Sequence, residues 1–154
     1  MRKKKVLVVE DQKLNRAVLK EILESEYDVL YAVNGKEALD IMNREGRHLS
    51  LVLLDIVMPV MDGYEVLKAM ERRKLLEQIP VLVASQHFGD DSELQALLLG
   101  AGDYVSKPYN PAVLKRRIKN QIRMHEALMQ VTVLEKDPVT GLYNKASFNN
   151  RAVN

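Results

Sequence analysis

Five short apolar runs, each followed by a longer stretch with helical spacing, constrain the fold of this chain most strongly. The runs lie at residues 5–9, 28–32, 50–54, 80–85 and 103–106. Because successive positions in them are apolar, both faces of each strand should be buried, which is typical of a parallel sheet covered by helices on both sides. Right-handed crossovers then predict a doubly wound α/β protein of the (βα)₅ type.

Length and composition agree with one domain plus a modest extension. The chain has 154 residues, a net charge of +2 and no cysteine. The lack of cysteine excludes a disulfide framework, a thiolate nucleophile and a cysteine-based zinc site. The charge balance gives no case for a nucleic-acid partner. The apolar run at the N-terminus is too short for a signal peptide, and no stretch is long enough for a membrane span. We therefore expect a cytoplasmic protein without a membrane partner.

Charged and hydroxyl residues follow four of the five predicted strands. Glu10 and Asp11 follow the first strand, Asp55 follows the third, Ser85 ends the fourth and Lys107 follows the fifth. Ligands of such sheets sit outside the carboxyl ends of the strands, so these side chains should converge. Three neighbouring carboxylates need a cation, and hard oxygen ligands suit Mg²⁺. With the metal bound, Asp55 could take up a phosphoryl group whose oxygens Ser85 and Lys107 would hold.

Each of these residues also has a simpler interpretation. Asp55 could form a turn, and Glu10 and Asp11 could cap the first helix. Ser85 could be a loop hydroxyl, and Lys107 could be a solvated lysine. Their shared position at the strand ends of one sheet favours chemistry over four separate structural roles.

Four segments resemble the receiver domain of two-component response regulators over residues 4–125. They read VLVVEDQKLNR, LVLLDIVMPVMDGYEVL, IPVLVAS and GAGDYVSKPYNP. The resemblance implies a flavodoxin-like fold with a five-stranded parallel sheet. It also implies that Asp55 is the phosphoacceptor and that Glu10, Asp11, Asp55 and the backbone carbonyl of Val57 bind Mg²⁺. A cognate histidine kinase or a phosphotransfer protein would supply the phosphoryl group.

The same resemblance assigns the residues that respond to phosphorylation. Lys107 would pair with the phosphoryl group, and Ser85 would move to hydrogen-bond it. Tyr104 matches the aromatic residue that turns inward with that hydroxyl, although it could also be an ordinary aromatic residue on a strand face. The Lys107–Pro108 peptide bond is often cis in this family.

Three positions bear on how fast an aspartyl phosphate would form and how long it would last. Gln86 stands where receivers usually have a small residue, so its amide could shield the aspartyl phosphate or slow its formation. Val57 and His87 occupy positions that tune dephosphorylation: Val57 cannot orient an attacking water, whereas His87 could. Val57 also argues against a haloacid dehalogenase-like phosphatase, because those enzymes need a second aspartate at that position.

The last predicted helix continues beyond what a receiver needs. The segment from residue 111 to 137 contains no glycine and no internal proline. Ile118 and Ile122 should face the sheet, and residues 126–136 read as a helical linker whose apolar spacing is not a clean heptad. The basic residues are better read as a solvated face than as a nucleic-acid patch; they are Lys115, Arg116, Arg117, Lys119 and Arg123.

Residues 137–154 resemble the start of GGDEF domains, the diguanylate cyclases. The segment DPVTGLYNKASFNNR matches their opening pattern, with Val139 and Lys145 as mild departures. The resemblance implies that the receiver is not itself an enzyme and that it controls dimerisation and a C-terminal output. That output would be a diguanylate cyclase making cyclic-di-GMP, and the cyclase domain would be truncated in this chain. Phosphorylation would favour a homodimer. The alternative is a phosphorylation-dependent interaction module without an enzymatic output.

Overall fold

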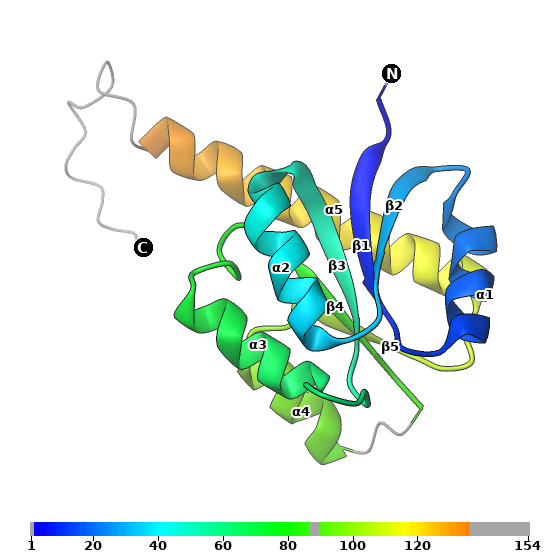
Figure 1. The fold of residues 1–154 in the computed structure, drawn as a ribbon. Helices are drawn as coiled ribbons and strands as arrows, with labels where there is room; N and C mark the ends of the chain where they lie inside the picture. The colour runs from blue at the N-terminus through cyan, green and yellow to red at the C-terminus, as the bar shows by residue number, and fades with distance from the viewer. Residues whose placement is uncertain (1, 87–89, 136–154) are drawn as a thin grey trace. The chain divides into compact units, whose positions relative to one another are not determined.

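The computed structural model describes residues 2–86 and 90–135, which form alternating strands and helices (Figure 1). The residues divide into one compact unit, Met1–Ile122, and a second unit that begins at Arg123. The elements in chain order are β1 Lys4–Val9, α1 Lys13–Leu23, β2 Tyr27–Ala32, α2 Gly35–Glu45, the short 3₁₀ helix η1 Gly46–His48, β3 Leu49–Asp55, α3 Gly63–Arg72, β4 Val81–Ser85, α4 Asp90–Leu98, β5 Asp103–Ser106 and α5 Pro111–Glu135.

The five strands form one parallel sheet in the order β2-β1-β3-β4-β5. This order reverses direction beside β1, and β1 and β3 end next to each other in the middle of the sheet. The predicted doubly wound α/β fold is therefore confirmed. The carboxyl ends of β1, β3, β4 and β5 share one edge, which is where such sheets place their ligands.

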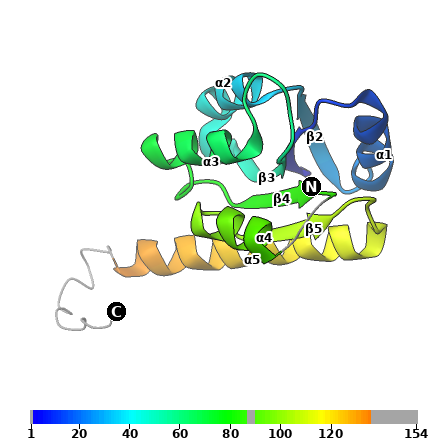
Figure 2. The same cartoon turned by 90° about the horizontal axis from the view of Figure 1, so that it is seen from below.

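Two apolar cores lie on the two faces of the sheet. Leu7 and Val9 contribute to the core under α2 and α3, whereas Val6 and Val8 contribute to the core under α1 and the first part of α5. This division follows from the two-residue period of a strand. Figure 2 shows α2 and α3 on the opposite side of β3 and β4 from α5.

The first part of α5 packs on the sheet as predicted. Ile118 and Ile122 are buried with residues of β1, β3 and β4. Helix α4 packs through a small residue: Ala96 faces the core, whereas Leu94, Leu97 and Leu98 are exposed. A small residue lets α4 approach the sheet closely, and its apolar side chains are left facing outward.

No helix among residues 2–86 and 90–135 has the length and apolar character needed to cross a bilayer. The predicted GGDEF-like segment, residues 137–154, lies outside the described residues, as does the last residue of the predicted linker.

Candidate functional site

The predicted residues meet at the carboxyl edge of the sheet. Glu10 and Asp11 directly follow β1, Asp55 and Ser85 are the last residues of β3 and β4, and Lys107 directly follows β5. Three of them, Asp55, Ser85 and Lys107, line a cavity of about 190 Å³. The rest of its lining consists of Gln12, Asn15, Val57 and Gln86.

Asp55 is held by the strand that carries it and by the loop that follows. Its register partner on β4 is Ala84, and the backbone N–H of Ile56 donates to the Ala84 carbonyl at 3.2 Å. The loop then folds back, because the Gly63 N–H donates to the Ile56 carbonyl at 2.8 Å. Asp62 and Glu65 cap the start of α3 with reciprocal hydrogen bonds, a capping box. Asp55 is thus fixed at the floor of the cavity, and the residue is only 5% exposed.

Three carboxylates and one ammonium form the centre of the site. Oxygens of Glu10, Asp11 and Asp55 all lie within 4.8 Å of one another. The Lys107 Nζ lies 2.8 Å from Glu10 Oε1 and 3.0 Å from Asp55 Oδ1. Lys107 is placed from its own backbone as well, since its N–H donates to the Ser85 carbonyl at 2.9 Å. The peptide bond from Lys107 to Pro108 is cis, as predicted.

The charge of Lys107 alone does not neutralise the three carboxylates, as the raised pKa of Asp55 shows. Burial raises the pKa of Asp55 to about 6; the hydrogen bond from Lys107 opposes this shift, and the charge of Glu10 adds to it. Burial also raises the pKa of Asp11. For Lys107, burial lowers the pKa, but the bonds to Glu10 and Asp55 outweigh burial and raise it overall.

The donor set fits a hard divalent cation. Three carboxylates within contact of one another supply only oxygen ligands, and the remaining positions face a cavity that admits water. Mg²⁺ favours this combination of a few carboxylates with several waters. A cation there would also offset the charges of Glu10 and Asp11, which add to the effect of burial on the pKa of Asp55.

Arg16 belongs to the site although the sequence did not single it out. Its Nη1 donates to the carbonyl of Glu10 at 2.9 Å and to the carbonyl of Asp11 at 3.0 Å. It therefore ties the acidic pair to α1. The sequence could have indicated Arg16 by its position, since it is the fourth residue of α1 and follows Asp11 by five positions.

The predicted tuning residues lie in different places. Val57 and Gln86 line the mouth of the cavity, and the Val57 side chain is 71% exposed. Two residues that the sequence analysis did not select line the same mouth: Gln12, the N-cap of α1, and Asn15 in its first turn. His87 lies outside the described residues.

Tyr104 does not enter the Asp55 cavity. It lines a separate cavity of about 160 Å³ between β5 and the start of α5. The Arg117 guanidinium lies 5.4 Å from the centre of the Tyr104 ring, and Arg117 Nη1 donates to the Tyr104 carbonyl at 3.1 Å and to Asp103 Oδ1 at 2.9 Å. A hydrogen bond with the Glu93 carboxylate raises the pKa of the Tyr104 hydroxyl. Tyr104 is thus held by α4 and α5.

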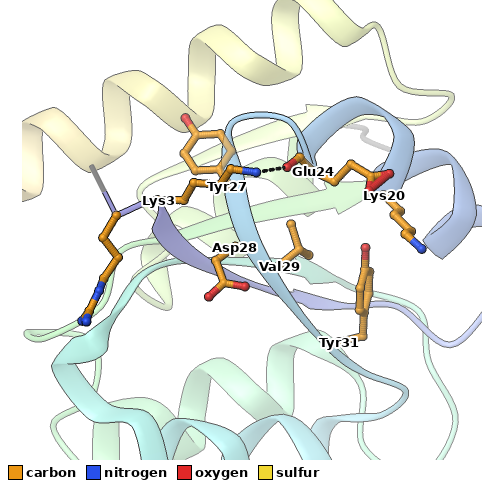
Figure 3. Close-up of a pocket in the computed structure, with 8 residues that line it drawn as sticks. Lys3, Lys20, Glu24, Tyr27, Asp28, Val29 and Tyr31 are labelled. Carbon is orange, nitrogen blue, oxygen red and sulfur yellow. Dashed lines mark hydrogen bonds between the residues drawn. The ribbon is translucent and has the colours of Figure 1, made fainter.

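Another cavity, of about 450 Å³, lies beside the edge strand β2 (Figure 3). Its charged side chains have both signs, and Lys3 Nζ is already bonded to the Glu24 carbonyl at 2.8 Å. The lining consists of Arg2, Lys3, Lys20, Glu24, Tyr27, Asp28, Val29 and Tyr31. Since no single ligand charge is favoured there, the Asp55 cavity is the stronger candidate site.

A family model for the response regulator receiver domain matches residues 6–119. The alkaline phosphatase synthesis transcriptional regulatory protein PhoP of Bacillus subtilis is 34% identical over 139 residues, which cover 90% of this chain and 56% of that protein. The probable transcriptional regulator ycf27 of Porphyridium aerugineum is 36% identical over 128 residues, covering 80% of this chain and 50% of that protein. The chain spans about half the length of these curated relatives.

Two solved structures are similar in fold. The receiver domain of a sensor histidine kinase from Pseudomonas aeruginosa PAO1, with a magnesium ion coordinated in its active-site cleft, has a TM-score of 0.71 at 26% identity and covers 78% of this chain and 98% of that one. A probable two-component system response regulator/GGDEF domain protein has a TM-score of 0.73 at 26% identity and covers 79% of this chain and 50% of that one.

Proposed function

The chain belongs to the response regulator receiver domain family, and from that membership we propose that Asp55 accepts a phosphoryl group from a histidine kinase or a phosphotransfer protein. The observation that carries the proposal is the position of Lys107, whose ammonium contacts both Glu10 and Asp55 at the floor of an open cavity. A carboxylate so placed is fixed, accessible and next to a cation that can hold phosphoryl oxygens.

In the proposed step, a carboxylate oxygen of Asp55 attacks the phosphorus of the donor. The bond from phosphorus to the donor's imidazole nitrogen breaks, and its electron pair stays on that nitrogen. Lys107 and the Ser85 hydroxyl hold oxygens of the transferred group. When bound, Mg²⁺ would be held by Glu10, Asp11, Asp55 and the Val57 carbonyl and would offset the phosphoryl charge. At pH 7 Asp55 is mostly ionised, since its pKa is about 6 even without the metal.

A partner protein that donates the phosphoryl group would meet exposed apolar side chains on the elements that border the cavity. Leu14 and Val18 on α1, and Val57 and Val60 on the β3–α3 loop, are large apolar side chains exposed to solvent. Val57 lines the cavity, and Leu14 adjoins Asn15, which also lines it. Apolar side chains around an accessible reactive group favour contact with a partner protein.

We also propose that phosphorylation changes the surface of α4, β5 and α5. Ser85 would move toward the phosphoryl group, and Tyr104 would leave Arg117 and Glu93 and turn inward. The exposed Leu94, Leu97 and Leu98 of α4 would then join a homodimer contact. Removing these apolar side chains from water would stabilise the dimer.

The output is proposed to be a diguanylate cyclase. The GGDEF-like sequence at residues 137–151 and the similarity to a response regulator/GGDEF domain protein support this proposal. A DNA-binding output is a second candidate, because the similar curated proteins are named as transcriptional regulators. An interaction module without an enzymatic output is the third. The coding sequence after Asn154 separates them: a Gly-Gly-Asp/Glu-Glu-Phe segment, a helix-turn-helix pattern or a stop codon.

Phosphorylation of Asp55 can be tested by intact mass after incubation with acetyl phosphate, with and without Mg²⁺. The wild type is expected to gain one phosphoryl group only with Mg²⁺, and Asp55→Asn is expected to gain none. Asp40→Asn, an exposed aspartate on α2, is the matched control and should behave as the wild type. A Mg²⁺-dependent adduct that persists in Asp55→Asn would refute the proposal.

A further inference from the structure

Three primary amides surround the mouth of the Asp55 cavity. The side chains that line it are those of Gln12, Asn15, Asp55, Val57, Ser85, Gln86 and Lys107. In the proposed function, Asp55 carries the phosphoryl group, and Ser85 and Lys107 hold its oxygens. Val57 is apolar. Among the described residues that line the cavity, only Gln12, Asn15 and Gln86 are therefore left to hydrogen-bond a water molecule at the mouth.

Of the three amides, Asn15 is the one held in place. It is half-buried in the first turn of α1, whereas Gln12 and Gln86 are exposed. Asn15 Nδ2 donates to Gln12 Oε1 at 3.2 Å. Gln12 is itself tied to the acidic centre, since its backbone N–H donates to Glu10 Oε2 at 3.1 Å. Because one N–H of Asn15 is used in this bond, its carbonyl oxygen remains as an acceptor and the Gln12 amide nitrogen remains as a donor.

The cavity has room for the reaction that such a pair could promote. Its volume of about 190 Å³ equals roughly six water molecules at ~30 Å³ each. A phosphoryl group on Asp55 therefore leaves space for a water at the mouth. Attack on phosphorus is in line with the bond that breaks, so the water must approach from the side opposite Asp55, which is the mouth.

We propose that Asn15, held by Gln12, positions the water that hydrolyses the phosphorylated Asp55, so that the chain carries its own residue for ending the signal. The water oxygen forms a bond to phosphorus, and the bond from phosphorus to the Asp55 oxygen breaks. The electron pair of that bond returns to the Asp55 carboxylate, and a water proton passes to a phosphoryl oxygen, giving inorganic phosphate. The Asn15 carbonyl accepts a hydrogen bond from the water and the Gln12 amide donates to the phosphoryl group. Neither amide takes up a proton.

The inference rests on the proposed phosphoacceptor role of Asp55, and one experiment can test both separately. The full chain is phosphorylated with acetyl phosphate and Mg²⁺, the small donor is removed, and the loss of the adduct is followed by intact mass. The variants are Asn15→Leu, which keeps the size but loses the amide, Asn15→Gln, which restores one, and Gln12→Leu. Asn43→Leu, an exposed asparagine on α2, is the matched control.

Loss of one oriented hydrogen bond is expected to slow dephosphorylation roughly three- to tenfold in Asn15→Leu. Gln12→Leu should slow it less, and Asn15→Gln should recover part of the rate. In Asn43→Leu both the formation and the loss of the adduct should stay within about twofold of the wild type, and recovery in Asn15→Gln separates loss of the amide from general loss of structure. Adduct formation with unchanged decay in Asn15→Leu would overturn the inference and leave the proposed function standing. No adduct on the wild type from acetyl phosphate or from a histidine kinase would overturn both.

Discussion

At Asp55 the fold places a buried carboxylate beside two others and supplies one ammonium, so the residue opposes folding when no metal is bound. Its pKa in the folded chain is about 6, against the ordinary value of 3.8. A carboxyl whose pKa is raised by folding binds protons more tightly in the folded state, and stability then falls as pH rises through the interval between the two values. This destabilising contribution of Asp55 to the free energy of unfolding is absent below about pH 4 and reaches its full size above about pH 6.

We therefore expect Asp55→Asn to stabilise the metal-free chain. At pH 7 the free energy of unfolding should rise by up to about 3 kcal/mol, since one pKa unit corresponds to 1.36 kcal/mol. Urea unfolding at a series of pH values measures this, and the advantage of the variant should shrink toward zero near pH 4. Asp40→Asn on α2 should show no such pH-dependent gain. A wild type that is more stable than Asp55→Asn at pH 7 in a chelator would contradict the prediction.

Val60 stores backbone strain in the loop that follows Asp55. Its φ angle is 72°, a left-handed value that β-branched residues rarely adopt, and its side chain is 78% exposed. Val60→Gly loses little burial and relieves the strain, so we expect a gain of roughly 0.5–1 kcal/mol in the free energy of unfolding. Val57→Gly is the control in the same loop: its φ angle is not left-handed, so the substitution should cost about 0.4–1 kcal/mol. Equal effects of the two substitutions, measured by urea unfolding, would argue against strain at Val60.

At the scale of elements, the turn from β3 into α3 depends on a close backbone approach at Gly63. A Cβ atom there would lie 2.6 Å from the Asp55 carbonyl oxygen and 2.8 Å from the Ile56 Cα. Both neighbours are backbone atoms that cannot rotate away. Gly63→Ala should therefore destabilise the chain by roughly 1–3 kcal/mol and displace Asp55, which would slow adduct formation with acetyl phosphate.

Thermal unfolding and the intact-mass assay together check the Gly63 prediction. Glu71→Ala, an exposed position near the end of the same helix, is the control and should change neither quantity much. Unaltered stability in Gly63→Ala would mean that α3 can shift outward without disturbing Asp55.

The elements show which parts of the site a sequence can predict. Glu10, Asp11, Asp55, Ser85 and Lys107 could be placed together because the strand ends of a parallel sheet share one edge. Small boundary differences did not matter: Asp55 lies inside β3 rather than after it, and Pro80 precedes β4.

Contacts from helices were harder to predict. Arg16 and Asn15 reach the site from α1, and their contribution depends on the rotation of that helix about its axis, which apolar spacing fixes only to within a broad stripe. The position of Tyr104 depends on Arg117 and Glu93, which lie on different helices. Long-range side-chain pairs of this kind leave no local pattern in the sequence.

At the scale of the whole molecule, the proposed phosphoacceptor and the proposed output surface belong to different elements. Asp55 ends β3, whereas the exposed leucines belong to α4, whose Ala96 is buried in the same core as Val81 and Val83 of β4. Ser85 at the end of β4 and Tyr104 on β5 are the residues between them. In the proposed function, Ser85 and Tyr104 change position when Asp55 is phosphorylated, and the exposed leucines of α4 form the contact that responds.

Dimerisation through α4 is the last prediction. Beryllium fluoride with Mg²⁺, a mimic of the phosphoryl group, should convert the chain from monomer toward dimer in light scattering. In a two-fold dimer each substitution acts twice, and burying a leucine contributes about 1.5–3 kcal/mol. Leu98→Gln should thus weaken the dimer by more than about tenfold. Leu14→Gln is closely matched, since Leu14 and Leu98 are both 76% exposed, but Leu14 lies on α1. Leu14→Gln should leave the dimer intact and slow phosphoryl transfer from a kinase. If Leu14→Gln weakens the dimer and Leu98→Gln does not, the dimer contact lies on α1 instead.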